Sequence, residues 1–178
     1  MTSKIKIALD CMGGDDAPTM VVRGADLAVE RQPDIFFHLV GNEEEIMPLI
    51  KASRHLDSDN HKITHTQKKV AADDKPSVAL RGGRDTSMRL SIDLVSDGSA
   101  HGVVSAGNTG ALMAMSKLSL RMCPGIERPA IASFFPTLKG ESCMLDLGAN
   151  IECDANNLVQ FAIMGEIFAR IVLGLKNP

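Results

Sequence analysis

The sequence predicts an α/β fold, a three-layer sandwich built on a mostly parallel sheet. Two observations lead to this prediction. Short apolar runs alternate with longer stretches in which apolar residues recur at helical spacing. The short runs are also continuously apolar, which is typical of parallel strands covered by helices on both faces. The 178 residues are enough for one such domain. We therefore expect a single α/β domain over 1–178, incomplete at its C-terminal end.

The first part of the chain alternates three predicted strands with two helices. The strands are the runs 4–10 (KIKIALD), 35–40 (IFFHLV) and, more weakly, 62–66. Pro18 opens the first helix, where a missing N–H costs nothing, and Asp15 or Asp16 can cap it. Asn42 begins the second helix, ahead of three glutamates that suit the positive end of the helix dipole. Polar residues predict loops at 56–61 and 67–76.

The second part of the chain continues the alternation. A helix is predicted over 86–96 and ends at Gly98, and a strand over 102–105 leads through a glycine-bearing turn into an apolar helix that reaches Leu120. Further strands are expected at 130–135 and 142–147, with a last helix over 155–173. Residues 174–178 are typical of a helix exit into another strand. We therefore expect the chain to be a fragment cut inside its fold.

Composition excludes several classes of function. A net charge of -3 and a pI near 5.9 argue against a nucleic-acid partner, as does the absence of Trp and Tyr for base stacking. The four cysteines are irregularly spaced and form no zinc or redox motif, so reduced thiols and no metal or other cofactor are expected. The chain has no secretory signal and no membrane-spanning run. These features indicate a soluble cytoplasmic protein, which could still rest on a membrane surface.

Three segments share one design, in which a buried strand is followed by a glycine-bearing turn with short polar residues. They are Asp10–Asp15 (DCMGGD), Ser105–Gly110 (SAGNTG) and Asp146–Asn150 (DLGAN). Ligands of open α/β sheets collect beyond the carboxyl ends of the strands. We therefore expect the three turns to enclose one polar cleft.

The middle segment carries the strongest prediction of an anion site. Gly107 and Gly110 allow the backbone to approach an anion closely, and the helix that starts near Thr109 offers free N–H groups. Ser105 and Asn108 add neutral hydrogen-bond donors. The alternative is a plain strand-to-helix turn in which Asn108 only caps the helix. The segment lacks both the dinucleotide fingerprint and the P-loop lysine.

Carboxylates and arginines supply the other candidates. Asp10 and Asp146 each end an apolar strand, where a carboxylate can orient a neighbour, act as a base or serve only structure. Asn150 can donate to a developing oxyanion or satisfy its own turn. Arginines around the loop before Thr86 match phosphate geometry, with a solvated helix face as the alternative; they are Arg81, Arg84 and Arg89.

The three segments also carry a resemblance to a known family. Asp10–Asp15 resembles the D-A-M-G-G-D opening of the bacterial phosphate acyltransferases of phospholipid synthesis. Residues 105–111 match that family's S-A-G-N-T-G-A and 146–150 its D-x-G-A-N, and 160–165 fits the following helix. Cys11 stands where the family usually has Ala, and Gly82-Gly83 falls in a stretch that is often basic in relatives. That second departure weakens a phosphate role for the loop at Arg84.

The resemblance implies a fold similar to phosphotransacetylase and isopropylmalate dehydrogenase-like folds. It also implies acyl transfer from fatty acyl-[acyl carrier protein] to inorganic phosphate, giving acyl phosphate and free carrier protein, without a cofactor. On this basis Asp10, Asn108, Asp146 and Asn150 are the expected catalytic residues. The phosphate-binding residues would be Gly13, Gly14, Ser105, Gly107, Thr109, Gly110 and Arg84. The family's chains continue well past Pro178, and the resemblance places a homodimer interface and peripheral membrane contacts in that part.

Two other functions remain open from the sequence alone. One is a phosphotransacetylase-like enzyme that uses short acyl-CoA, which a comparison of thioester donors would separate. The other is a binding or assembly fragment without catalysis, which would capture acyl carrier protein without turnover. A nicotinamide dehydrogenase is disfavoured, because no acidic residue stands at the expected ribose position.

Overall fold

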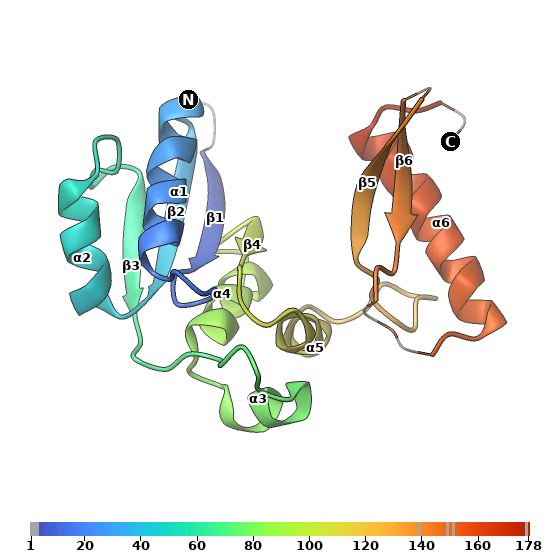
Figure 1. Ribbon diagram of the computed structural model, residues 1–178, viewed down its shortest axis with the longest axis horizontal. Helices are drawn as coiled ribbons and strands as arrows, with labels where there is room; N and C mark the ends of the chain where they lie inside the picture. Colours follow the sequence, from blue (N-terminus) through green and yellow to red (C-terminus); the bar gives the residue numbers. More distant parts are fainter. Residues whose placement is uncertain (1–3, 139, 149, 151, 177) are drawn as a thin grey trace. The chain divides into compact units, whose positions relative to one another are not determined.

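The computed structural model describes residues 4–138, 140–148, 150, 152–176 and 178. The chain divides into two compact units, one reaching Arg121 and the other beginning at Met122 (Figure 1). Each unit is described by itself. The expectation of one domain over 1–178 stays a prediction.

The first unit is built on a four-stranded parallel sheet. Its strands are β1 (Ile5–Asp10), β2 (Ile35–Gly41), β3 (His61–His65) and β4 (Gly102–Val104). Their order is β3-β2-β1-β4, so the first strand of the chain lies inside the sheet between β2 and β4. All three strand pairs are parallel, which confirms the predicted sheet. The carboxyl ends of β1 and β4 consequently meet at one edge.

Five helices accompany this sheet. They are α1 (Thr19–Arg31), α2 (Glu43–Ala52), α3 (Pro76–Gly82), α4 (Ser87–Ser96) and α5 (Thr109–Leu120). Asn42 caps α2 as predicted, accepting from the Glu44 N–H at 3.3 Å. The cap predicted for α1 is wrong: Pro18 occupies the N-cap position and no side chain caps the helix. Helix α3 was not expected from the sequence, which predicts a loop there.

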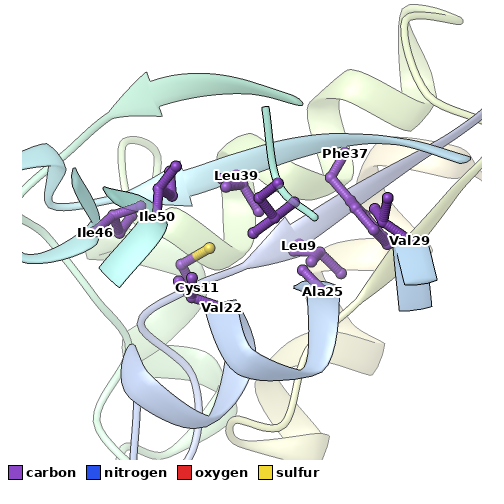
Figure 2. Close-up of a cluster of buried hydrophobic side chains, with 10 residues drawn as sticks. Leu9, Cys11, Val22, Ala25, Val29, Phe37, Leu39, Ile46 and Ile50 are labelled. Atoms are coloured by element: carbon purple, nitrogen blue, oxygen red, sulfur yellow. The ribbon is translucent and has the colours of Figure 1, made fainter. Parts of the chain in front are cut away.

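Helices α1 and α2 cover one face of the sheet with an apolar core (Figure 2). Alternate residues of a strand point to opposite faces, so Leu9 and Cys11 both face α1. They pack there with side chains of α1, β2 and α2, namely Val22, Ala25, Val29, Phe37, Leu39, Ile46 and Ile50. The opposite face receives α4, whose Met88 and Ile92 are buried with Ala111 and Met115 of α5. The first unit is therefore a three-layer α/β sandwich.

The same alternation explains the position of Asp10, the last residue of β1. Its side chain faces away from the core of α1 and α2 and towards α4. It is only 1% exposed, although it lies at the end of a strand. The sheet thus places a buried carboxylate beneath the edge where the two glycine-bearing turns leave β1 and β4.

The second unit consists of a hairpin and a long helix. Strands β5 (Ala132–Thr137) and β6 (Gly140–Leu145) pair with each other, and α6 (Ala155–Val172) follows them. Phe134 stacks on Phe168 with ring centroids 5.4 Å apart. Both strands were expected from the sequence, and they form an antiparallel pair. The physical reason is the short connection, because a parallel crossover needs a dozen or more residues.

No helix among the described residues combines the length and the apolar character needed to cross a membrane.

Candidate anion-binding site

Asp10 is the centre of a buried hydrogen-bond network. Its Oδ1 accepts the Ser87 hydroxyl of α4 at 2.6 Å, and its Oδ2 accepts the Ser105 hydroxyl at 2.7 Å. The N–H of Met12 also donates to Oδ1, at 3.3 Å. Short O–H···O⁻ bonds are among the stronger hydrogen bonds in proteins. Asp10 therefore fastens three segments to one another: the turn after β1, the start of α4 and the turn after β4.

Ser105 connects Asp10 to the backbone of the turn after β4. Its hydroxyl donates to Asp10, and its oxygen accepts the N–H of Gly107 at 3.1 Å. The backbone conformation around Gly107 is thus linked to the carboxylate below it. Asp10 itself is buried, so this arrangement favours an orienting role for the carboxylate over direct contact with a ligand.

Glycine is required where the two turns touch. A Cβ placed on Gly13 would lie 2.6 Å from Asp10 Oδ2, 2.8 Å from Ser105 Oγ and 3.0 Å from the Gly107 nitrogen. A Cβ on Gly107 would approach Gly13 Cα to 3.2 Å and Met88 Cε to 3.1 Å. Two of the three segments with the shared design, those after β1 and β4, are consequently brought into backbone contact, as the sequence predicts.

Asn108 holds the turn in place with all of its side-chain polar atoms. Its Oδ1 accepts the N–H of Ala111 at 2.9 Å and caps α5. Its Nδ2 donates to the carbonyls of Ala72 at 3.0 Å and Asp74 at 2.9 Å, and more weakly to Ala71 at 3.4 Å. The amide therefore ties the loop at 71–74 to the start of α5. The helix-cap interpretation of Asn108 is confirmed, and a second structural contact is added to it.

A cavity of about 620 Å³ opens beside these turns, and we call it the turn cavity. It is lined by Met12, Gly14, Asp15, Lys69, Val70, Ala71, Ala72, Ala106, Gly107, Asn108, Thr109 and Gly110. Thr109 and Gly110 begin α5, where N–H groups have no intrahelical acceptor. Such groups, together with the positive end of the helix dipole, favour an anion. Five of the predicted site residues therefore line this cavity, namely Gly14, Gly107, Asn108, Thr109 and Gly110.

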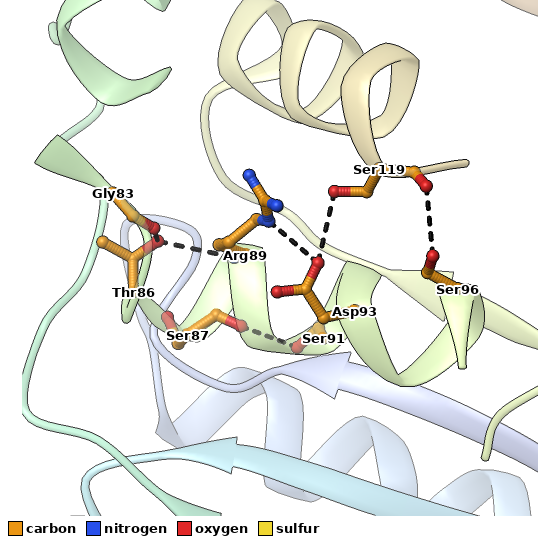
Figure 3. A network of polar contacts seen from close by, with 8 residues as sticks. All are labelled: Gly83, Thr86, Ser87, Arg89, Ser91, Asp93, Ser96 and Ser119. Carbon is orange, nitrogen blue, oxygen red and sulfur yellow. Dashed lines mark hydrogen bonds and ion pairs between the residues drawn. The ribbon is translucent and has the colours of Figure 1, made fainter. Parts of the chain in front are cut away.

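Other predicted site residues lie outside the lining of the turn cavity. Asp10, Gly13 and Ser105 form the layer that supports it. Arg84 is exposed in the turn between α3 and α4 and does not line the cavity. Arg89 is paired with Asp93 at 2.8 Å, in a network that continues to Ser119 of α5 (Figure 3). A phosphate contact from Arg84 stays a prediction.

The third segment lies in the second unit, where it forms a compact loop of its own. Asp146 follows β6 with a positive φ of 61°, and its Oδ1 accepts both the N–H of Asn150 at 3.1 Å and the side-chain amide of Asn150 at 2.9 Å. The same amide donates to the Pro129 carbonyl at 2.9 Å. Ala149 of the predicted motif lies outside the described residues. That all three segments share one cleft stays a prediction.

Two cysteines lie next to these carboxylates. Burial and the charge of Asp10 raise the pKa of the Cys11 thiol to about 12, although a hydrogen bond with Val40 opposes the shift. Desolvation and a hydrogen bond to Asp146 raise the pKa of Cys153. A thiol must ionise to act as a nucleophile. Neither cysteine therefore has the character of a reactive thiolate.

Sequence reasoning missed two residues of the site. Ser87 bonds Asp10 across 77 residues of chain, and no local pattern predicts that contact. Lys69 lines the turn cavity from a segment that the sequence marks only as a polar loop. Within the described ranges, no group of three or more His, Cys, Asp or Glu side chains is placed to hold a metal ion.

Comparison with known proteins gives this site a family context. A family model described as "Fatty acid synthesis protein" matches residues 5–178. Similar proteins named "Phosphate acyltransferase" come from Rhodospirillum centenum, at 62% identity, and from Rhodospirillum rubrum, at 58%, each aligned over the whole of this chain. The alignments cover 50% and 51% of those proteins, so the chain spans about half the length of the curated relatives it matches.

The match includes the parallel sheet and both glycine-bearing turns that form the turn cavity, as well as the loop at Asp146. The chain therefore belongs to the fatty acid synthesis protein family.

Proposed function

We propose that this chain is the N-terminal portion of an acyltransferase that moves a fatty acyl group from acyl carrier protein to inorganic phosphate. The observation that carries the proposal is the turn cavity, in which the backbone of 106–110 and the start of α5 face a space large enough for an anion. The names of the relatives agree with phosphate as acceptor. The donor is the part of the proposal that rests on resemblance.

In this reaction the protein mainly has to position phosphate and the thioester relative to each other. A phosphate oxygen attacks the thioester carbonyl, a C–O bond forms, and the C–S bond of the donor breaks. With hydrogen phosphate as acceptor, its proton ends on the departing thiol and acyl phosphate is released. Phosphate is already an anion, so the site must hold it beside the carbonyl and stabilise the tetrahedral oxyanion.

Most of the predicted residues have a role in this scheme. The N–H groups of Thr109 and Gly110 are proposed to contact phosphate or the oxyanion, and Gly107 lets the backbone approach it closely. Asp10 and Ser105 hold those groups in place from below. Asn108 acts by keeping the loop at 71–74 closed against the turn. Asp146 and Asn150, which orient one another, are proposed to complete the site.

The test is phosphate-dependent release of carrier thiol from a long-chain acyl-[acyl carrier protein], with this chain as catalyst. Thiol release that requires phosphate and yields acyl phosphate supports the proposal. Equal or faster turnover of short acyl-CoA would favour the phosphotransacetylase alternative. Capture of the carrier protein by a folded sample without thiol release would favour a binding fragment.

Asn108→Ala sharpens the test because a matched control exists. Asn42 also caps a helix through its side chain, but it does so at α2 and does not line the turn cavity. Each substitution removes one cap, at a cost of about 1 kcal/mol. Only Asn108→Ala also releases the carbonyls of Ala72 and Asp74. We expect it to raise the phosphate concentration needed for half-maximal rate, while Asn42→Ala leaves that concentration unchanged.

The homodimer and the membrane contacts are further predictions that depend on the same proposed function. A homodimer and peripheral membrane contacts are predicted for the longer proteins that this chain resembles. Both are tested by the oligomeric state and vesicle binding of such a longer chain.

A further inference from the structure

Two adjacent lysines after β3 have different surroundings. Lys68 Nζ lies 2.6 Å from Asp85 Oδ2, and its charge is neutralised by that ion pair. Lys69, the next residue, lines the turn cavity. The two residues are of the same type and lie in the same loop, but Lys68 pairs with Asp85 whereas Lys69 lines the cavity.

The backbone around Lys69 is anchored on both sides. The carbonyl of Lys68 accepts the N–H of Ser87 at 2.9 Å, which is the residue that also bonds Asp10. Val70 is buried in the core between α3, α4 and α5. Beyond it, Asn108 holds the carbonyls of Ala72 and Asp74. Lys69 is therefore attached to a fixed wall of the cavity, even though its side chain is exposed.

The charge balance of the turn cavity points to a role for this side chain. Among the residues that line it, Lys69 is the one cation and Asp15 the one anion, and both are exposed. The other lining groups are apolar, neutral or backbone. Backbone N–H groups at a helix start favour an anion, but a phosphate that carries two negative charges gains further from a mobile ammonium group.

We propose that Lys69 is a phosphate-binding residue, which holds the anion against the start of α5. This inference rests on the proposed function, and it adds a residue that neither the glycine-bearing turns nor the arginines of the sequence identify. Lys69 sets the affinity for phosphate, whereas the backbone of Gly107–Gly110 sets its position. The negative charge of Asp15, which also lines the turn cavity, lowers the affinity for phosphate.

The experiment measures binding of inorganic phosphate to the 178-residue chain by isothermal titration at low ionic strength. Lys69→Ala is expected to raise the dissociation constant roughly five-fold, which is the scale of one solvent-exposed charge contact to an anion. Lys68→Ala is the matched control, with an unchanged dissociation constant. Asp15→Asn is expected to lower the constant, because it removes the negative charge from the cavity. Added sodium chloride should shrink all of these differences through screening.

The outcomes separate the two proposals. Phosphate binding that is equally tight in Lys69→Ala and the unaltered chain overturns the role of Lys69 and leaves the proposed function standing. Equal weakening by Lys68→Ala and Lys69→Ala also overturns it, because general surface charge would then explain both. A folded chain that binds no phosphate at millimolar concentration overturns the anion site itself, and the role of Lys69 with it.

Discussion

The Ser87 hydroxyl offers the sharpest test of the network around Asp10. Ser87→Ala removes the 2.6 Å bond to Asp10 Oδ1, and both residues are only 1% exposed. Within the part of the chain that the structure describes, the N–H of Met12, at 3.3 Å, is then the remaining hydrogen-bond partner of that oxygen. A hydrogen bond to a charged group contributes about 1.5–3 kcal/mol, and the buried oxygen cannot exchange it for water.

Substitution of a neighbouring serine, Ser91, serves as a control for the contribution of the Ser87–Asp10 hydrogen bond. Ser91 lies one turn further along α4, is fully buried, and donates its hydroxyl to the Ser87 carbonyl at 2.8 Å (Figure 3). Ser91→Ala removes a neutral bond, which contributes about 1 kcal/mol. The gain in helix propensity applies to Ser91→Ala, because Ser91 lies inside α4 and Ser87 is its first residue. Ser87→Ala should therefore lower the free energy of unfolding by about 0.5–2 kcal/mol more than Ser91→Ala.

Urea unfolding followed by far-ultraviolet circular dichroism measures this difference, since the chain has no Trp or Tyr to serve as a fluorescent probe. Amide exchange of β1 assigns the loss to the first unit. A difference below about 0.5 kcal/mol, with an unchanged urea slope, would show that the network adds no more than an ordinary neutral bond.

Three further predictions follow from other parts of the first unit. Gly13→Ala should destabilise the protein by about 1–3 kcal/mol, because the added Cβ would meet Asp10 and the neighbouring turn. Gly24→Ala should stabilise it by about 0.5–1 kcal/mol, because nothing lies within 4 Å of the added carbon in α1. Thermal melts of the two variants measure both changes. Cys11, with a pKa of about 12, should not react with maleimide at pH 8 until the chain unfolds, whereas exposed Cys123 should react at once. Peptide mapping measures the labelling of both cysteines. Early labelling of Cys11 would contradict its burial. Burial opposes the shift at Asp26, but the N–H groups of residues 54–56 lower its pKa below the ordinary 3.8. The ionised carboxylate of Asp26 therefore contributes its full stabilisation above pH 3.8, and this contribution is lost as the pH falls through the lower pKa of the folded state. In an acid titration, Asp26→Asn should lose less stability than the unaltered protein over this pH range.

The parallel sheet and its main helices were predictable because their signals are local. Residues of β1 and β2 are mostly apolar, and Asn42 stands where a cap is expected. Helix α3 was missed because it has seven residues and ends in Gly82-Gly83, although Pro76 at its start was a usable signal. The cap of α1 failed because Pro18 itself takes the N-cap position.

The hairpin of β5 and β6 shows a different limit. Both strands were expected from their apolar runs, but strand direction depends on the connection between them. A connection of two residues between Thr137 and Gly140 forces an antiparallel pair. The length of that connection could have been read from the sequence once the strand ends were known to within one or two residues.

The candidate site was predictable in part. Asp10, Ser105 and the two glycine-bearing turns were identified because parallel strands bring their carboxyl ends to one edge. Ser87 and Lys69 were not, because each reaches the site from an element whose place no nearby residue reveals. The amide of Asn108 bonds carbonyls 34 to 37 residues earlier in the chain, and only the folded loop shows those acceptors.

The central position of β1 has a consequence for how the protein is made. Strand β1 leaves the ribosome before β4, and Ser105, which bonds Asp10, comes 95 residues after that carboxylate. At roughly 5–20 residues per second, translation takes about 5–20 s to supply that partner. Until then the nascent sheet lacks β4, and the carboxylate at the end of β1 stays in water. Closing so long a loop slows folding more than it weakens the product. The turn cavity is thus completed only near the end of synthesis of the first unit.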